Sequence, residues 1–319
     1  MEHNHTRRIG LSLNADLIDG DMPTLEKHLG FVADSGATVV ELILHGLDVV
    51  IAGRLNPARL SQVRRILDRF DLSRSLHLPY DLNLLSSQQS EPFRRCFEAG
   101  IDFATETGCE AMTYHSSFME LGEGAQKSAF YSRFGSDPDT QYEGLLRYDQ
   151  EVLADLASRT AGHTVIGVEN TAWNDPATRR TYGTNPRKVC AHIAPIEHPR
   201  LGLTLDVGHL NMTATTDHSD MVDDIDAVCK HILHIHTHDN FGNSTPSARY
   251  MDALAYGYGD LHLPVGWGTI PWDRVLPALA SYTGIWMMEI EFRFFPHFPT
   301  IVTDMTERLR EVDRHAISR

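Results

Sequence analysis

The sequence contains few cysteines and very few lysines, and both shortages limit what the protein can be. Its four cysteines are scattered without any C-x-x-C spacing, at Cys96, Cys109, Cys190 and Cys229. This spacing argues against a disulfide framework and against a thiolate zinc site. We therefore expect four reduced thiols in a cytoplasmic protein. Lysine occurs only four times among the 28 basic residues, so contacts to anions would fall mostly to arginine.

Long apolar runs are also missing. No stretch of roughly 18 apolar residues occurs, so we predict no membrane span. The first residues, MEHNHTRR, are polar and charged. We therefore expect no signal peptide, and a disordered tail over residues 1–7. The 28 basic and 43 acidic residues give a net charge of −15. This charge disfavours unspecific binding to nucleic acid or to an anionic membrane, although it leaves room for a local basic groove.

Short apolar runs alternate with amphipathic stretches along the whole chain. The pattern predicts strands at residues 8–13, 38–44, 72–79, 111–115, 164–170, 201–207, 232–238 and 285–292. Between and after them it predicts helices at residues 23–35, 57–70, 91–107, 141–161, 186–193, 221–229, 272–281 and 301–316. Eight strand–helix pairs in 319 residues predict an α/β fold, a single (β/α)8 TIM barrel over residues 8–319. A doubly wound open sheet ranks behind it, because polar residues gather at most strand ends and not at one switch point.

The strand at 232–238 carries the first sign of chemistry. Its histidines at 234, 236 and 238 share one parity, and buried imidazoles are costly unless they have partners. A loop beyond it contains Asp260 and His262, which are two residues apart and can close on one ion. We therefore predict that His236, Asp260 and His262 help to build a metal site.

Ligand-type residues also follow most of the other predicted strands. Singly, each is a weak signal, because a histidine or glutamate at a strand end is commonly structural or solvated. Together, five imidazoles and four carboxylates in one barrel mouth would be unstable without cations. Nitrogen and oxygen ligands without thiolate favour Zn, Mn, Fe or Co. The nine predicted ligands are His77, His115, Glu169, Asp206, His209, His236, Asp260, His262 and Glu289.

Several motifs around these residues resemble the xylose isomerase-like TIM barrel superfamily. They are HLPYDLNL at His77, VENTA at Glu169, LDVGH at Asp206, HTHDN at His236, GDLHLPVGWG at Asp260 and MEI at Glu289. This superfamily includes sugar phosphate isomerases and epimerases and the endonuclease IV-like proteins (AP endonuclease family 2). The resemblance implies one ion held by Glu169, Asp206, His236 and Glu289, with His209 near the substrate. The endonuclease IV-like members add ligands for a three-metal cluster, and the resemblance places these at His77, His115, His209, Asp260 and His262.

Two enzymatic functions follow from the resemblance. The filled positions for a multinuclear site favour metal-dependent hydrolysis of a phosphoester, in a small sugar phosphate or phosphodiester, through metal-activated water. The alternative is a sugar or sugar phosphate isomerase or epimerase with one ion, in which Glu169 and Glu289 pass a proton between adjacent carbons. In both, Glu169, Glu289 and His209 are the catalytic residues. We expect one to three divalent ions per chain, Zn, Mn or Fe. A non-catalytic metal-binding module and DNA as substrate are disfavoured.

Weaker signals surround the predicted site. Trp173 and Trp267 could stack on a sugar or simply pack, and Tyr80 could contact substrate or cap a strand. Arg293 is a further candidate for substrate contact, or forms a rim pair with Glu291. His234 and His238 are ordinary buried histidines or partners of a ligand. Residues 118–141 are a lid over the mouth or a plain connection. Homo-oligomerisation is left open.

Overall fold

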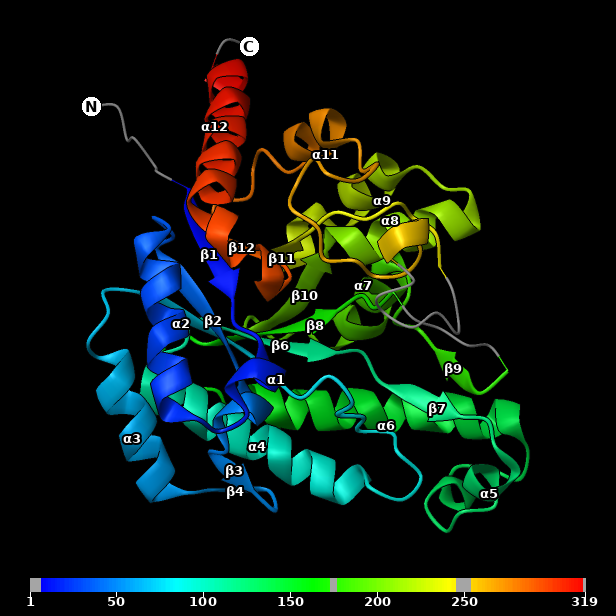
Figure 1. The fold of residues 1–319 in the computed structure, drawn as a ribbon. Coiled ribbons are helices and arrows are strands. Elements are labelled where there is room, and N and C mark those ends of the chain that lie inside the picture. Colours follow the sequence, from blue (N-terminus) through cyan, green and yellow to red (C-terminus); the bar gives the residue numbers. More distant parts are fainter. Residues whose placement is uncertain (1–6, 173–176, 245–253, 318–319) are drawn as a thin grey trace.

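Eight parallel strands close into a barrel in the computed structural model, which describes residues 7–172, 177–244 and 254–317 (Figure 1). Around the barrel the strands follow the order β1-β12-β11-β10-β8-β6-β5-β2. The expected single (β/α)8 barrel is therefore confirmed. The strands are β1 (Arg8–Ser12), β2 (Val39–Ile43), β5 (Ser73–His77), β6 (Ala111–His115), β8 (Val165–Glu169), β10 (Leu201–Asp206), β11 (Ile232–Thr237) and β12 (Ile285–Met288).

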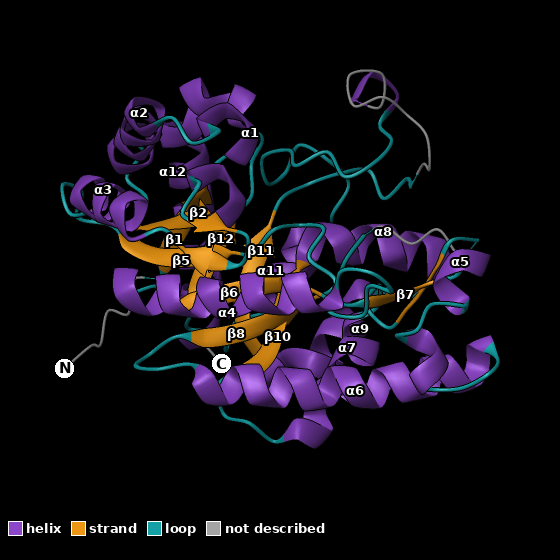
Figure 2. Ribbon diagram, turned by 90° about the horizontal axis from the view of Figure 1, so that it is seen from below, coloured by secondary structure: helices purple, strands orange, loops and turns teal. Residues whose placement is uncertain are grey.

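Helices surround the strands on the outside of the barrel (Figure 2). Several begin in the same way: an Asn or Asp side chain caps the first turn, and proline follows at the favoured first position, as at Asn56-Pro57, Asp137-Pro138 and Asn185-Pro186. The helices are α1 (Ala15–Ile18), α2 (Met22–Asp34), α3 (Pro57–Leu67), α4 (Ser90–Thr107), α5 (Glu123–Gln126), α6 (Pro138–Arg159), α7 (Pro186–Ile193), α8 (Val207–Asp217), α9 (Met221–Val228), α11 (Trp272–Ala278) and α12 (Phe298–Ile317).

Side chains alternate along each strand between the helix-facing core and the barrel interior. In β2, Val40 and Leu42 belong to the large core under the helices. Val39 instead joins Ile285 and Met287 in a small cluster of its own. Because residues two apart on a strand share a face, Glu41 points the same way as Val39, into the barrel. The interior-facing parity of the strands therefore carries the polar residues that the site needs.

Residues 118–141, for which a lid and a plain connection were both open, form part of a packed projection. Its strand β7 (Phe118–Glu120) pairs antiparallel with β9 (Arg179–Thr181), beside α6 in Figure 1. A second core holds Leu85, Met119, Tyr131 and Leu145. The Tyr131 hydroxyl donates to the Leu85 carbonyl at 2.8 Å and accepts from the Glu120 amide at 2.9 Å.

The structure differs from the prediction in several places. Strand β12 ends at Met288, not at residue 292, because the chain turns into the 3-10 helix η5 (Phe292–His297). Helix α8 was not predicted: Gly208 and His209 lie in its first turn, which the Asp206 side chain caps. Arg7, assigned to the tail, donates to Asp313 and to the carbonyls of Ala280 and Tyr282. The tail residues 1–6 lie outside the described residues. Among the described helices, none is long and apolar enough to cross a membrane.

A buried carboxylate ties α6 to the segments around it. Asp149 is fully buried and accepts from Ser117 Oγ at 2.7 Å and from Tyr182 OH at 2.7 Å. His192 Nε2 lies 2.8 Å from the same carboxylate. Three donors converging on one buried carboxylate replace the water that it loses on burial.

We predict that Asp149→Asn lowers the free energy of unfolding by roughly 2 kcal/mol, because a charge-assisted acceptor is lost while its donors stay buried. Chemical denaturation followed by circular dichroism measures this. An unchanged midpoint with an unchanged slope would show that the network does not stabilise the fold.

Candidate metal centre

The carboxyl ends of the barrel strands open onto a cavity of about 320 Å³. Its lining combines imidazoles and carboxylates from both ends of the sequence. The lining residues are Ser12, Leu13, Asn14, Asp16, His77, Tyr80, His115, His209, Asp260, His262, Glu289, Ile290 and Glu291. A volume of this size suits one small polar molecule.

Glu169, at the end of β8, lies at the centre of the histidines. It is fully buried, and its Oε2 lies 3.3 Å from both His77 Nε2 and His115 Nε2. Its Oε1 lies 3.1 Å from His236 Nδ1. One carboxylate therefore contacts three imidazoles: Oε2 faces those from β5 and β6, and Oε1 faces the one from β11.

A second feature is the crowding of carboxylates around His236. Glu169, Asp206, His236 and Glu289 each offer one ligand atom, and these four atoms lie within 4.8 Å of one another. Glu289 Oε2 is 3.5 Å from His236 Nδ1. Three carboxylates this close repel one another strongly in a buried site unless positive charge lies between them.

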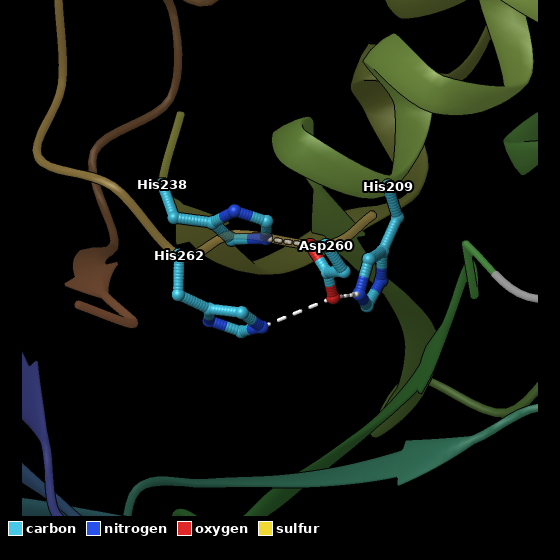
Figure 3. A group of neighbouring side chains, drawn as sticks. All are labelled: His209, His238, Asp260 and His262. Carbon is cyan, nitrogen blue, oxygen red and sulfur yellow. Dashed lines mark hydrogen bonds and ion pairs between the residues drawn. The ribbon is translucent and has the colours of Figure 1, made fainter. Parts of the chain in front are cut away.

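Next to this group lies another, formed by His209, His238, Asp260 and His262 (Figure 3). Asp260 is its hub: Oδ2 lies 2.9 Å from His209 Nε2 and 3.0 Å from His262 Nε2. Asp260 Oδ1 lies 3.5 Å from His238 Nε2. Three imidazoles and one carboxylate make a donor set that suits zinc or another borderline divalent ion.

Four of the histidines are fixed in the same manner. Each has its Nδ1 against a backbone carbonyl oxygen, which can only accept, so Nδ1 carries the proton. The carbonyls belong to Leu78 at 2.6 Å for His77, Tyr80 at 2.9 Å for His115, Asn170 at 2.8 Å for His209 and Glu289 at 2.8 Å for His262. Each Nε2 is thereby directed at the carboxylates. Metal-ligating histidines are held in this way by their outer nitrogen.

The charges of the site reinforce one another. Burial disfavours the charged imidazoles, but the neighbouring carboxylates outweigh it: they raise the pKa of His77, raise that of His209 and His236 well above the usual range, and raise that of His262 to about 10. Burial would likewise raise the pKa of Glu169, but His236 and His115 hold it well below its usual value. Protons on these rings therefore occupy the place that a cation would take.

The loop that carries Asp260 and His262 is anchored by Asp239. The Asp239 and Leu263 backbones exchange hydrogen bonds of 2.7 and 3.0 Å, and the Asp239 side chain accepts from Gly266 N and Trp272 Nε1, each at 2.9 Å. His262 itself has φ +45°, a left-handed conformation that costs a non-glycine residue about 1 kcal/mol or more. Such strain persists where surrounding contacts fix it, and here it directs a ring into the site.

Several buried polar atoms of the site make no hydrogen bond among the described residues. They are Glu169 Oε2, Asp206 Oδ2, Asp260 Oδ1 and the ring nitrogens of His238. Buried polar atoms without partners are rare in native proteins and point to an ion or water. These oxygens and nitrogens are hard and borderline donors, with no cysteine among the candidate groups. The residues present therefore fit one or more divalent cations.

All nine predicted ligands meet at the mouth, and Tyr80 lines the cavity. Two other predicted substrate contacts, Trp267 and Arg293, are not among its lining residues. Trp267 is half exposed and packs edge-on against Phe294, and the Arg293 guanidinium lies over the same ring at 5.1 Å. Trp173 lies outside the described residues. Glu291 is part of the cavity wall.

Three residues were not among the predicted ligands. His238 belongs to the Asp260 group, while Glu41 and His234 form a further group with His236 below the mouth. Parity with His236 indicated the two histidines. For Glu41 the available signal was a lone carboxylate inside the apolar run VVELI.

Several known proteins are similar to the chain. A curated uncharacterized protein of Methanocaldococcus jannaschii is 25% identical over 283 residues, which is 84% of each chain. A D-tagatose 3-epimerase-like protein of known structure superposes with a TM-score of 0.65 at 22% identity, covering 95% of this chain and 98% of the other. A xylose isomerase-like TIM barrel protein from Mycobacterium smegmatis, solved in complex with magnesium, gives 0.66 at 17% identity, covering 98% and 99%.

A closed parallel barrel of eight strands with helices on its outside defines a TIM-barrel protein. The model of the family described as xylose isomerase-like TIM barrel matches residues 29–311, and the chain belongs to that family.

The raised histidine pKa values predict how the metal-free protein responds to pH. The imidazole of a histidine in the unfolded chain has a pKa of about 6.5. The raised folded-state values therefore contribute stability that is fully present below about pH 6.5 and is lost as pH rises, through about 10 for His262. We expect the metal-free protein to unfold more easily at pH 9 than at pH 6.5, in denaturant titrations with chelator present.

The raised histidine pKa values also predict how metal binding depends on pH. A divalent ion must displace these protons, so calorimetric titration with Mn²⁺ at pH 7 should release protons, and the apparent Kd should fall as pH rises. Heats that do not vary with the ionisation enthalpy of the buffer would contradict this account.

Gly208 in the first turn of α8 lies against the His238 ring. A Cβ at this position would come within 2.0 Å of His238 Cε1. We predict that Gly208→Ala displaces His238 and weakens Zn²⁺ binding by its group, although alanine favours a helix by up to about 1 kcal/mol over glycine. The matched control is Gly30→Ala in α2, where the added Cβ meets nothing within 4 Å. Equal Zn²⁺ affinity in both variants would argue against a role for His238.

Proposed function

We propose that the protein is a divalent-metal-dependent isomerase or epimerase that acts on a small sugar. The observation that carries the proposal is the group of Glu169, Asp206, His236 and Glu289, whose ligand atoms lie within 4.8 Å of one another beside a cavity of about 320 Å³. The likeness to a D-tagatose 3-epimerase-like protein supports this alternative better than the phosphoester hydrolysis that the sequence favoured.

Glu169, Asp206, His236 and Glu289 would hold the ion. Their three carboxylates and one imidazole suit Mn or Mg as well as Zn or Fe, and a relative with the same fold was solved with magnesium. When bound, such an ion supplies Lewis acidity, which polarises carbonyl and hydroxyl oxygens of a sugar and makes the neighbouring C–H more acidic.

The side chains differ in their access to a substrate. Glu289 lines the cavity and is the carboxylate that can accept a proton from the sugar C–H next to the carbonyl. Glu169 lies beneath it, fully buried, and is the partner proposed to return a proton at the other carbon or face. His209 reaches the same cavity, with Nε2 against Asp260, and is placed to donate to a substrate oxygen.

The charge of the cavity favours a neutral sugar over a phosphorylated one. Among the described residues, its lining contains the carboxylates Asp16, Asp260, Glu289 and Glu291 but no Lys or Arg. A phosphate group would meet these carboxylates without a basic side chain to pair with. We therefore place uncharged ketoses first among the candidate substrates.

Phosphoester hydrolysis remains the second candidate because of one observation. The group of His209, His238, Asp260 and His262 adjoins the first, and His77 and His115 face Glu169 on its other side. A single-ion isomerase does not need these additional donors, whereas clustered ions suit the cleavage of phosphoesters.

The two candidates predict different outcomes with simple probes. Incubated with Mn²⁺ and D-tagatose, D-fructose or D-allulose in D₂O, the protein should incorporate deuterium at the carbon next to the carbonyl and form the epimer or aldose. Glu289→Gln should reduce this by at least about 100-fold, since general acid–base catalysis contributes roughly 10²–10⁴-fold.

The discriminating control uses bis(p-nitrophenyl) phosphate and a sugar phosphate under the same conditions. Release of nitrophenol or inorganic phosphate without deuterium exchange would overturn the isomerase proposal in favour of hydrolysis. Metal content per chain, measured by elemental analysis, adds an independent criterion: about three equivalents favour the hydrolytic cluster.

A further inference from the structure

His236 is oriented differently from four other imidazoles of the mouth, those of His77, His115, His209 and His262. In those four, Nδ1 faces a backbone carbonyl and Nε2 faces the carboxylates. In His236, Nδ1 faces the carboxylates, 3.1 Å from Glu169 Oε1 and 3.5 Å from Glu289 Oε2. Its outer nitrogen is therefore Nε2, and that nitrogen points down into the barrel.

The partner of this outer nitrogen is a carboxylate. Glu41 Oε2 lies 3.3 Å from His236 Nε2, and Thr113 Oγ1 lies 3.4 Å from the same nitrogen. Glu41 comes from β2, almost opposite β11 in the barrel order, so the contact crosses the interior. Because a carboxylate can only accept, the contact requires a proton on Nε2. Nδ1 also faces a carboxylate, Glu169, so it is the nitrogen whose proton a cation would displace.

Glu41 is itself held in place by donors. Its side chain is fully buried, and Oε2 accepts from Ser75 Oγ at 3.1 Å and lies 3.4 Å from His234 Nε2. An isolated buried carboxylate would cost several kcal/mol, so its retention in an otherwise apolar strand requires such partners. Both contacts are to the oxygen that faces His236.

We propose that Glu41 is a positioning residue: its carboxylate accepts from His236 Nε2–H and thereby directs Nδ1 toward Glu169, Asp206 and Glu289, where the ion binds. This rests on the proposed metal-dependent function. A carboxylate in this position also makes the imidazole a stronger donor to a cation than a carbonyl partner does. Glu41 thus acts on the ion through His236 and does not touch the substrate.

The test compares metal affinities of the full-length protein stripped with chelator. Loss of a carboxylate that orients a ligand histidine costs roughly 10- to 100-fold in metal affinity. We expect Glu41→Gln to raise the Kd for Mn²⁺ within that range, and Glu41→Leu, which has no acceptor, to raise it further. Calorimetric titration of wild type and variants measures this.

Asp149→Asn is the matched control. It makes the same carboxylate-to-amide change at another fully buried residue that faces a histidine. The contacts of Asp149 described above are not to any candidate metal ligand. Its Kd for Mn²⁺ should equal that of wild type even though the protein unfolds more easily. A shift of equal size in both variants would mean that Glu41 acts only through general stability, and would overturn the proposal.

Other outcomes are equally decisive. If wild type binds no Mn²⁺, Mg²⁺ or Zn²⁺, the proposed function fails; if wild type binds and Glu41→Gln binds equally well, only the role of Glu41 fails. Glu41, His234 and His236 also lie close enough to hold an ion themselves. Loss of one whole equivalent of metal in Glu41→Gln would assign Glu41 as a ligand and overturn the positioning role.

A measurement on unmutated protein covers the case in which the variants do not fold. Nitrogen-15 correlation spectra of the Zn²⁺-loaded protein report which ring nitrogen of His236 carries hydrogen. Hydrogen on Nε2 is the expected result, and hydrogen on Nδ1 would overturn the proposal.

Discussion

The mutual repulsion of buried carboxylates is the constraint on which the rest of the structure depends. Glu41, Glu169 and Asp206 are fully buried, and Glu289 is nearly so. In water such groups would be hydrated, whereas at the barrel mouth imidazoles, hydroxyls and the His209 amide face them. The histidines, the backbone carbonyls that orient them and the anchored loop around Asp260 all serve to hold positive charge between these oxygens.

The barrel makes this arrangement feasible because it places the apolar core and the charged site on opposite faces of the same strands. The helix-facing core of Leu, Val and Ile side chains stabilises the fold, and the polar residues occupy the opposite parity of the same strands. The charged site is therefore confined to one end of the interior. Burial elsewhere, as in the Asp149 network and the second core under β7, offsets the destabilising effect of the buried charges.

Strand periodicity and the polar residues at strand ends were sufficient to predict the barrel and the nine residues that meet at its mouth. The remainder depended on contacts between distant strands. Glu41 in β2 is one carboxylate in an apolar run, and only barrel closure brings it to His236. Helix α8 was missed because its glycine and histidine read as a turn, although Asp206 is a good N-cap. For Trp267 the sequence left stacking on a sugar and simple packing open, and its ring packs on Phe294.

The cavity wall is divided between two structural origins. One side contains the histidines and carboxylates of the candidate groups. The other contains Ser12 at the end of β1, Leu13 and Asn14 in the β1–α1 turn, and Asp16 in α1. That turn carries none of the candidate ligands. Its residues can therefore change in shape and polarity without disturbing the ion-binding geometry. In evolutionary terms, substrate preference and metal chemistry can diverge independently in this barrel, and the β1–α1 turn is the natural place to redesign specificity.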